Sequence, residues 1–327
     1  MIAITIGDAA GIGPEIVLKA LDRFDTSRFV VYGGARILRQ AMDIPGVPYR
    51  DMNLVGDDLE TVEGRINVVD LETPDLSSFR YGVESAACGR VAYECIAKAV
   101  ADAMDGRLSC VCTAPLNKVS LRLAGIPYIG HTEIFASLTG CDDPLTMFQV
   151  DGLRVFFLSR HVSLVEACRM VTYERLMDYI PRCIDELRKL KVEGTLAVAG
   201  LNPHCGEHGL FGDEERCIEA AVSKCRSMGL DVSGPVGADS VFHQCLKGRY
   251  GGVLSLYHDQ GHIAAKTYDF DRTISVTLGM KVLRFSVDHG TAFDIAGKGV
   301  ADETGMVETL AHALAYEDRV SGIAGGR

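Results

Sequence analysis

The sequence predicts an α/β protein with two domains built around mainly parallel sheets. Short runs of β-branched and apolar residues alternate along the 327 residues with longer segments of helical period. The run Ile66–Asp70, for example, precedes Cys88–Met104, in which apolar residues recur every fourth position from Val91 to Ala103. Alternation at this length is typical of βαβ units, and the chain is long enough for two domains sharing a large buried core.

The predicted strands share an apolar, β-branched composition bounded by glycine or polar residues. They lie at Ala3–Ile6, Phe29–Tyr32, Ile66–Asp70, Ser109–Thr113, Arg154–Leu158, Leu196–Gly200, Gly252–Tyr257 and Ile274–Thr277. The predicted helices show a helical period, in two cases with acidic residues at the start and basic residues at the end. Beside Cys88–Met104, they lie at Asp178–Lys191, Asp213–Met228 and Glu303–Tyr316.

Composition argues against several classes of function. The formal net charge of −11 argues against nucleic acid as a partner, because phosphate backbones attract basic surfaces. No apolar run of 18 residues occurs and no basic region precedes the first strand, so we expect neither a membrane span nor a signal peptide. The eleven cysteines lie mostly in apolar segments without a CxxC pair, so we expect reduced thiols in a cytoplasmic protein.

Three histidines, His161, His204 and His258, stand at the ends of predicted strands. Parallel strands present their carboxyl ends at one edge of the sheet, where α/β ligand sites lie. Three neutral imidazoles with an open position suit Zn²⁺ or another divalent transition metal. A single histidine after a strand is more often structural, but the shared position of these three favours a site. The competing candidates are His208, His262 and His289.

Charged residues near these histidines extend the candidate site. Asp259 follows His258 and is a candidate partner to orient an imidazole. Lys266 follows within reach of the same edge, and with Arg284 it could neutralise an anionic substrate locally. Solvated surface charge is the alternative for each.

His131 lies after Gly130 at a predicted helix start, where Thr132 could cap the helix. A histidine, a hydroxyl and helix-end N–H groups suit a small anion. An N-cap beside an exposed histidine explains the same residues equally well. The earlier segment Gly7–Glu15 also opens a helix, with Pro14 in its first turn, but its glycine spacing is not GxGxxG. A tight structural turn and a ligand loop are both compatible with it.

The segment Asp288–Asp302 (DHGTAFDIAGKGVAD) predicts a cofactor loop. Its glycines Gly290, Gly297 and Gly299 allow the backbone to approach a ligand closely. Asp294 could accept hydrogen bonds from ribose hydroxyls, which favours NAD over a 2′-phosphorylated cofactor. A glycine-rich turn without a ligand is the alternative.

Seven stretches together carry a resemblance to a known family. In chain order they are GDAAGIGPE, TAPLNK, AGIPYIGHTE, GLNPHCGEHGLFGDEE, GPVGADSVF, YHDQGH and SVDHGTAFDIAGKGVAD. They extend from residue 7 to residue 302 and resemble the 4-hydroxythreonine-4-phosphate dehydrogenase family of pyridoxal phosphate (pyridoxine) biosynthesis. The last stretch also resembles the cofactor loop of isopropylmalate and isocitrate dehydrogenases, which share this fold.

The resemblance implies a homodimer whose subunits have an interdomain cleft, with the active site completed across the subunit interface. Residues 1–125 with 285–327 would form the first domain, which carries the cofactor loop, and residues 126–284 the second. The family's metal ligands fall on His161, His204 and His258, and the metal would be Zn²⁺, Co²⁺, Mg²⁺ or Mn²⁺.

The implied reaction is NAD-dependent oxidation of a secondary alcohol to a β-keto acid that loses CO₂, with the metal as Lewis acid. The family's phosphate contacts fall on His131 and Thr132. Its other substrate contacts fall on Lys266, Ser275 and Arg284, and the cofactor contacts on His289, Gly290, Asp294 and Gly297. Lys266 and Asp259 are the candidates for the general base, with Asp239 and Lys118 as alternates.

One departure bears on the substrate. Ser275 stands where the biosynthetic enzymes of the family have asparagine, and it lacks the amide donor. The family resemblance implies 4-phosphohydroxy-L-threonine as the substrate. Because of the Ser275 departure, D-threonate or D-erythronate 4-phosphate and a dihydroxy-cyclohexadiene dicarboxylate are the alternatives. Two other classes stay open: a three-histidine metallohydrolase or aldolase without nicotinamide, and a catalytically silent binding protein.

Overall fold

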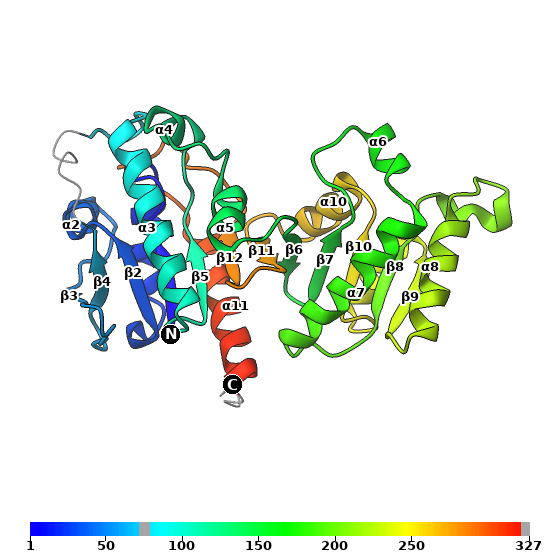
Figure 1. The fold of residues 1–327 in the computed structure, drawn as a ribbon. Coiled ribbons are helices and arrows are strands. Elements are labelled where there is room, and N and C mark those ends of the chain that lie inside the picture. The colour runs from blue at the N-terminus through cyan, green and yellow to red at the C-terminus, as the bar shows by residue number, and fades with distance from the viewer. Residues whose placement is uncertain (72–78, 322–327) are drawn as a thin grey trace. The chain divides into compact units, whose positions relative to one another are not determined.

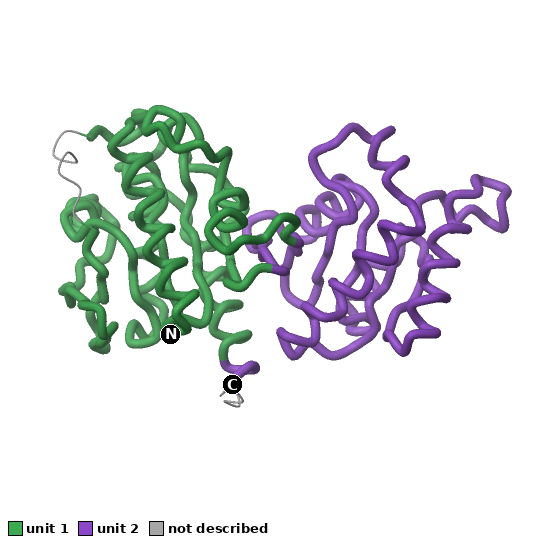
Figure 2. Tube along the Cα trace, in the orientation of Figure 1, with its two compact units in different colours: residues 1–144, 280–317 green, residues 145–279, 318–327 purple. Residues whose placement is uncertain are grey.

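A computed structural model describes residues 1–71 and 79–321 (Figure 1). The chain divides into two compact units (Figure 2). Unit 1 comprises Met1–Pro144 and Met280–Glu317, and unit 2 comprises Leu145–Gly279 with the chain end from Asp318. Strands and helices alternate in both units, which confirms the α/β class.

Unit 1 contains a parallel sheet with the strand order β3-β4-β2-β1-β5-β12 (Figure 1). Its strands are β1 (Ile2–Thr5), β2 (Phe29–Gly33), β3 (Met52–Leu54), β4 (Ile66–Asp70), β5 (Cys110–Thr113) and β12 (Arg284–Val287). The strands β1, β2, β5 and β12 are buried along their whole length, as expected for parallel strands with both faces covered.

The helices of unit 1 pack on this sheet and on one another. They are α1 (Gly13–Leu21), α2 (Ala35–Met42), α3 (Ala86–Met104), α4 (Lys118–Leu123), α5 (His131–Thr139) and α11 (Thr304–Ser321), with a short 3₁₀ helix, η1 (Thr26–Arg28). Helix α3 contacts β1, β2 and β5, and α4 and α5 pack on α3. The ring of Tyr316 on α11 stacks on Phe285 of β12, with 5.8 Å between the ring centroids.

Unit 2 contains a mixed sheet with the strand order β11-β6-β7-β10-β8-β9. Its strands are β6 (Leu145–Val150), β7 (Leu153–Phe157), β8 (Leu196–Ala199), β9 (Val232–Val236), β10 (Gly252–Ser255) and β11 (Ile274–Leu278). Strand β6 is antiparallel to both β11 and β7, whereas β7, β10, β8 and β9 are parallel to one another.

The two faces of the unit 2 sheet are covered by different helices. The helices of this unit are α6 (Leu164–Arg169), α7 (Tyr173–Lys189), α8 (Glu215–Ser227), α9 (Ala238–Leu246) and α10 (His258–Tyr268), with the 3₁₀ segment η3 (Pro203–Gly209). Val155 and Phe157 of β7 belong to the core cluster beneath α9 and α10. Phe156 between them lies on the other face, where it and Leu187 of α7 both approach Gly252. This alternation follows the two-residue period of a strand.

All eight predicted strands are confirmed to within two residues at each end, and the described residues contain four further strands that were not predicted. Two of these, β3 and β12, have only three or four residues. Strand β9 contains glycine and proline (VSGPV), which usually indicate a turn. The four predicted helices are also present, although α7 begins five residues earlier than expected because the Thr172 hydroxyl caps it.

The compact units divide at 144/145 and 279/280, whereas the prediction placed the boundaries at 125/126 and 284/285. Helix α5 packs on α3, which joins residues 126–144 to unit 1. The eleven cysteines are all free thiols. Among the helices that the structure describes, none has the length and apolar character needed to cross a membrane.

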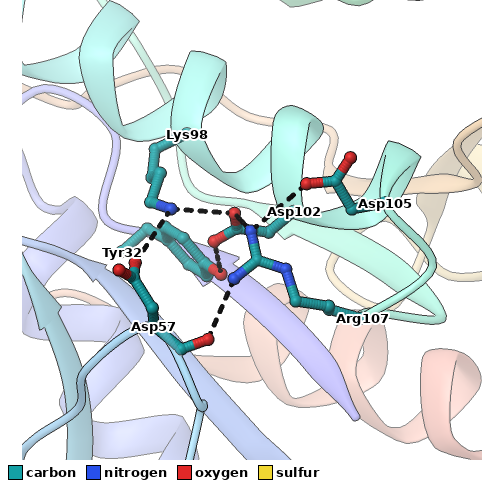
Figure 3. Close-up of polar contacts among 6 residues, drawn as sticks. All are labelled: Tyr32, Asp57, Lys98, Asp102, Asp105 and Arg107. Atoms are coloured by element: carbon teal, nitrogen blue, oxygen red, sulfur yellow. Dashed lines mark hydrogen bonds and ion pairs between the residues drawn. The ribbon is translucent and has the colours of Figure 1, made fainter.

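Near the end of α3, the buried carboxylate of Asp102 bonds to side chains from other segments of unit 1 (Figure 3). Its oxygens accept hydrogen bonds from the Tyr32 hydroxyl (2.6 Å) and Lys98 Nζ (2.9 Å) and contact the guanidinium of Arg107. Arg107 Nη1 also donates to the carbonyl of Asp57 at 3.1 Å. Burial raises the pKa of the Tyr32 hydroxyl, so it stays protonated as the donor. The cluster joins β2, α3 and the segment around Asp57, and its role is structural.

Candidate functional site

The three histidines of the predicted metal site follow three adjacent parallel strands. Strand β10 pairs with β7 on one side and with β8 on the other. His161 follows β7, His258 opens α10 directly after β10, and His204 lies in η3 after β8. The prediction that they emerge at the carboxyl ends of parallel strands is therefore confirmed. We call His161, His204 and His258 the histidine edge.

His161 and His258 are neighbours at this edge, with 5.7 Å between their ring centroids. The Nδ1 atom of His258 lies 2.6 Å from Oδ1 of Asp259. A carboxylate at that nitrogen makes Nδ1 the donor and leaves Nε2 as the lone-pair nitrogen. Asp259 thus makes the orienting contact expected of it.

His262 supports His258 from behind. The two rings stack with centroids 3.7 Å apart, and His262 Nδ1 lies 2.8 Å from the carbonyl oxygen of His258. The His262 ring also contacts Phe148 and Phe157, at centroid distances of 4.2 and 4.4 Å. Burial lowers the pKa of His262 to about 4, so it is neutral at physiological pH. Its surroundings make it a packing residue.

His204 stands on an unusual loop. The residues from His204 to His208 all have positive φ, between 42° and 75°. The buried carboxylate of Glu215, the first residue of α8, holds the start of this loop. Its Oε1 accepts the backbone N–H groups of Leu201 (2.8 Å) and Asn202 (2.6 Å), and its Oε2 accepts the Asn202 side-chain amide (2.8 Å). Sequence reasoning missed Glu215; its only signal was its place as the third of three consecutive acidic residues at a predicted helix start.

The fit of the histidine edge to a metal is incomplete. Within residues 1–71 and 79–321, no group of three or more His, Cys, Asp or Glu side chains is arranged to hold a metal ion. His161 and His258 supply suitable nitrogen donors close together, whereas His204 is exposed on its own loop. Among the described residues, the three histidines share an edge of the sheet, but His204 is not gathered with His161 and His258.

A cavity of about 270 Å³ opens beside His161 and His258. Its wall combines apolar side chains of α6 with polar groups from the ends of β7 and β10. The lining residues are Arg160, His161, Val162, Leu164, Ala167, Tyr257, His258 and Asp259. The cavity therefore gives a small molecule access to two of the three histidines.

A second constellation lies in unit 1 around His131, the first residue of α5. The helix is capped by the backbone of Gly130 without a side-chain hydrogen bond, so the prediction that Thr132 caps it is wrong. The helix begins at His131, two residues earlier than a Thr132 cap would give, which places Thr132 inside the first turn. The Nε2 atom of His131 is buried and has no hydrogen-bond partner among the described residues. Burial, followed by the charge of Arg284, lowers the pKa of His131 well below its usual value.

Arg284 is buried beside His131, with an exposed fraction of 5%. Its Nε donates to Thr113 Oγ1 at 3.1 Å, and its guanidinium lies 5.6 Å from the Phe135 ring centroid. Burial lowers the pKa of Arg284 to about 9, which leaves it charged at neutral pH. A buried cation beside an unsatisfied imidazole suits a small anion such as a phosphate. We call His131, Thr113 and Arg284 the anion cradle; sequence reasoning missed Thr113.

Lys266 and Ser275 both lie close to Phe148 of β6. Lys266 Nζ is 5.9 Å from the Phe148 ring centroid and 5.2 Å from that of Phe270. Ser275 is paired with Phe148 across the antiparallel β11–β6 register and is half-buried. Of the alternates for the general base, Lys118 opens α4 and Asp239 lies in the first turn of α9.

The segment 288–302 is held by packing on other parts of unit 1. A Cβ on Gly297 would lie 2.5 Å from the Tyr81 ring, and one on Gly299 would lie 1.9 Å from the Pro45 carbonyl oxygen. Both glycines also have positive φ. Protein contacts therefore explain these two glycines, whereas a Cβ on Gly290 would meet no atom of the described residues within 4 Å. The exposed residues of the segment include His289, Gly290 and Asp294.

The segment Gly7–Glu15 packs against the same loop. Ile12 N donates to the Thr291 carbonyl at 3.0 Å, and a Cβ on Gly11 would lie 2.9 Å from Thr291. The buried Glu15 carboxylate accepts hydrogen bonds from Ala301 N and Lys19 Nζ, each at 2.9 Å. These contacts support the structural interpretation of the segment, as a turn that positions the 288–302 loop.

Known proteins that resemble this chain give a consistent result. The family described as "Pyridoxal phosphate biosynthetic protein PdxA" matches residues 25–313. A curated relative from Clostridium botulinum, named "Putative D-threonate 4-phosphate dehydrogenase", is 51% identical over 325 residues, which cover 98% of this chain and 97% of the relative.

Two solved structures are similar over nearly the whole chain. A crystal structure of 4-hydroxythreonine-4-phosphate dehydrogenase from Klebsiella pneumoniae is 39% identical with a TM-score of 0.90, covering 97% of this chain and 99% of that one. A terephthalate 1,2-cis-dihydrodiol dehydrogenase from Burkholderia xenovorans is 27% identical with a TM-score of 0.69, covering 96% and 97%.

Proposed function

Because the chain belongs to the PdxA family of pyridoxal phosphate biosynthetic proteins, we propose that it oxidises and decarboxylates a four-carbon 4-phosphorylated hydroxy acid with NAD and a divalent metal. The expected substrate is 4-phosphohydroxy-L-threonine, in line with the names of the solved relatives. D-threonate 4-phosphate is the second candidate, because the 51% identical relative carries that name.

The anion cradle is the observation that carries this proposal. His131 Nε2 is buried with no partner in the described part of the chain, and the charge of Arg284 is buried beside it. Leaving the His131 nitrogen unsatisfied is costly, whereas a phosphate dianion would accept hydrogen bonds from His131 and Arg284 together. Thr132, in the first turn of α5, is the third proposed phosphate contact, where helix N–H groups also favour an anion.

The histidine edge is the proposed place of the metal. His161 and His258 would hold it, and His204 would complete the set from its own loop. A divalent metal of this kind, Zn²⁺, Co²⁺, Mg²⁺ or Mn²⁺, acts as a Lewis acid on an alcohol oxygen when bound. Asp259 contributes by fixing the ring of His258, and His262 by packing behind it.

The proposed NAD contacts are His289, Gly290, Asp294 and Gly297, and NAD supplies the hydride acceptor. The first three are exposed on a loop whose conformation is fixed by packing, and Gly297 acts through that packing, where it meets Tyr81. Asp294 is the proposed acceptor for the ribose hydroxyls.

The reaction requires one proton to leave the alcohol as the C–H hydride departs. The bond to the carboxylate then breaks, CO₂ leaves, and the carbon left behind takes up a proton. Lys266 and Asp259 are the proposed groups for these proton transfers, with Asp239 and Lys118 as alternates. Ser275, paired with Phe148 beside Lys266, is the proposed contact for the middle of the substrate.

We further propose that the protein is a cytoplasmic homodimer whose site is completed by the second copy. Free thiols at all eleven cysteines support a reducing compartment. A groove of about 590 Å³ between α9 and α10 supports a protein contact there, with Ile263 62% and Tyr268 49% exposed. Sedimentation equilibrium would test the oligomeric state.

The test is NADH formation, followed by absorbance, with each of the four metals and three substrates: 4-phosphohydroxy-L-threonine and the 4-phosphates of D-threonate and D-erythronate. We expect NADH and CO₂ from at least one of them, and none from the dephosphorylated compounds. Thermal protection by NAD separates this function from a hydrolase or aldolase without nicotinamide. Failure of NAD to bind at millimolar concentration would contradict the proposal.

A further inference from the structure

Arg160 lies at the end of a strand of unit 2, beside the histidine edge. It follows β7, directly before His161, and lines the cavity beside His161 and His258. Its guanidinium donates to the Thr146 hydroxyl, and no carboxylate of the described residues pairs with it. Arg160 is half-buried, and Thr146 is buried.

Two other arginines of the same unit, Arg272 and Arg175, have acidic or carbonyl partners. Arg272 lies 2.8 Å from Oδ1 of Asp151, and Arg175 donates to the Leu158 carbonyl at 2.7 and 3.0 Å. A guanidinium keeps its charge at any physiological pH and has five donors to satisfy. The Arg160 charge is therefore held at the cavity wall with most of its donors unused by the described residues, a condition that an anionic ligand would relieve.

Resting on the proposed function, we propose that Arg160 binds the substrate carboxylate that leaves as CO₂, and that it makes the site favour a 2-hydroxy acid over a 2-amino acid. This role places D-threonate 4-phosphate ahead of 4-phosphohydroxy-L-threonine and so reverses the order of the two substrate candidates. Arg160 and two histidines, His161 and His258, line the same cavity of about 270 Å³. A carboxylate matches the fork of the guanidinium and can bind it through two hydrogen bonds.

The charges around the cavity explain the preference for a hydroxyl next to that carboxylate. Of the described residues in the cavity lining, Asp259 alone carries a carboxylate; its side chain is 71% exposed and already bonded to His258 Nδ1. The ammonium of a 2-amino acid would be repelled by the Arg160 charge, and apart from Asp259 the lining has no carboxylate to balance it. A hydroxyl at the same carbon carries no charge and is not repelled. The 2-hydroxy acid therefore gains the carboxylate contact without the repulsion.

Because decarboxylation removes the carboxylate, binding of that group by Arg160 can be distinguished from a purely structural role of this residue. When the carbon–carbon bond breaks, its electron pair stays with the carbon next to the new carbonyl, and the carboxylate leaves as neutral CO₂. The three-carbon ketone phosphate that remains has no carboxylate for Arg160 to bind. Arg160 should thus contribute to the affinity for the substrate but not to that for the product.

The experiment compares Arg160→Gln and Arg160→Lys with the wild-type holoenzyme. Arg169→Gln is the matched control, an exposed arginine on α6 outside the cavity lining. The measurements are KM and kcat with D-threonate 4-phosphate and with 4-phosphohydroxy-L-threonine, and the inhibition constant of dihydroxyacetone phosphate. Thermal unfolding shows whether each variant is folded, and Arg160→Lys, which keeps the charge, is the second variant should Arg160→Gln unfold.

We expect Arg160→Gln to raise KM for D-threonate 4-phosphate by about 10- to 100-fold, the range for a lost charge-assisted hydrogen bond, with a smaller rise for Arg160→Lys. The inhibition constant of the ketone phosphate should stay unchanged, and the preference for the 2-hydroxy acid should fall. An unchanged KM, or an equal loss of substrate and product affinity, would overturn the role of Arg160 while the dehydrogenase function stands. A wild-type enzyme that forms no NADH with these two acids or with D-erythronate 4-phosphate would overturn the proposed function, and the role of Arg160 with it.

Discussion

The anion cradle of unit 1 and the histidine edge of unit 2 both contain histidines, but they differ in how far those side chains are buried and held in place. In the cradle, His131 Nε2 and the Arg284 guanidinium are buried and held by surrounding side chains. At the edge, His161 and His204 are exposed, whereas His258 is fixed on two sides, by Asp259 and His262.

The difference indicates how each site binds. In the cradle, His131 Nε2 is buried without a partner among the described residues, and Thr113 holds the buried Arg284 side chain in place. Such groups are preorganised for a ligand, because the free-energy cost of burying them is already included in the fold. Exposed histidines that do not converge need the ligand, or a second chain, to order them. We therefore expect the cradle to bind phosphate without a metal, and the edge to change when a metal binds.

The strongest loss should come from disrupting the cradle. Arg284→Gln should raise KM for the phosphorylated substrate by about 1000-fold, because it removes a buried charge paired with the ligand. Steady-state kinetics with the 4-phosphorylated acids measure this change. Lys281→Gln, an exposed cation three residues earlier, is the control and should leave KM unaltered. A rise in KM of less than tenfold for Arg284→Gln would contradict phosphate binding at the anion cradle.

The next effect concerns the 288–302 loop, whose glycines Gly297 and Gly299 pack on Tyr81 and Pro45. Gly299→Ala should destabilise the protein by about 2–4 kcal/mol, because the new Cβ meets the Pro45 carbonyl at a residue with φ of +73°. Gly290→Ala, with open space around it among the described residues, should unfold at the wild-type temperature and lower only the affinity for NAD. Thermal unfolding with and without NAD separates the two. Equal unfolding temperatures would mean that packing does not fix this loop.

A smaller effect tests the loop of the histidine edge. Glu215→Gln should weaken Co²⁺ binding by about 10- to 100-fold, because the carboxylate that holds Leu201 and Asn202 also sets the loop carrying His204. The visible spectrum of bound Co²⁺ gives the affinity. Glu219→Gln, an exposed position on the same helix, is the control. Unchanged Co²⁺ affinity would mean either that His204 does not bind the metal or that Glu215 does not position the loop that carries His204.

The smallest effect concerns pH. The folded pKa of His131 is lowered below its usual value of 6.5, so the unfolded chain binds the proton more readily. Stability should therefore fall as the pH drops below about 6.5, by at most about 1.4 kcal/mol per pH unit for this group. The pKa of His262 is lowered too, and this residue contributes with the same sign between about pH 6.5 and 4. Chemical denaturation of His131→Gln should show a shallower dependence than wild type, and an identical slope would contradict the burial of His131.

The two sites also differ in how far a sequence reveals them. The histidine edge was predictable, because strand patterns locate His161, His204 and His258 at the ends of parallel strands. The supporting residues were not, because the role of Glu215 or Thr113 depends on which backbone or side-chain donor tertiary packing brings to it. Arg160 was missed for the same reason, since only the fold shows that no described carboxylate reaches its guanidinium.

The division into units has a consequence for synthesis on the ribosome. All six strands of the unit 2 sheet lie in one continuous segment, Leu145–Gly279, so this unit can fold as soon as that segment has emerged. Unit 1 must wait, because β12 and α11 come from beyond residue 280 while their neighbours precede residue 144. In nascent chains that pause once residue 280 has left the exit tunnel, unit 2 should therefore be folded and resistant to protease. Residues 1–144 of the same chains should still be sensitive to protease, because unit 1 lacks β12 and α11.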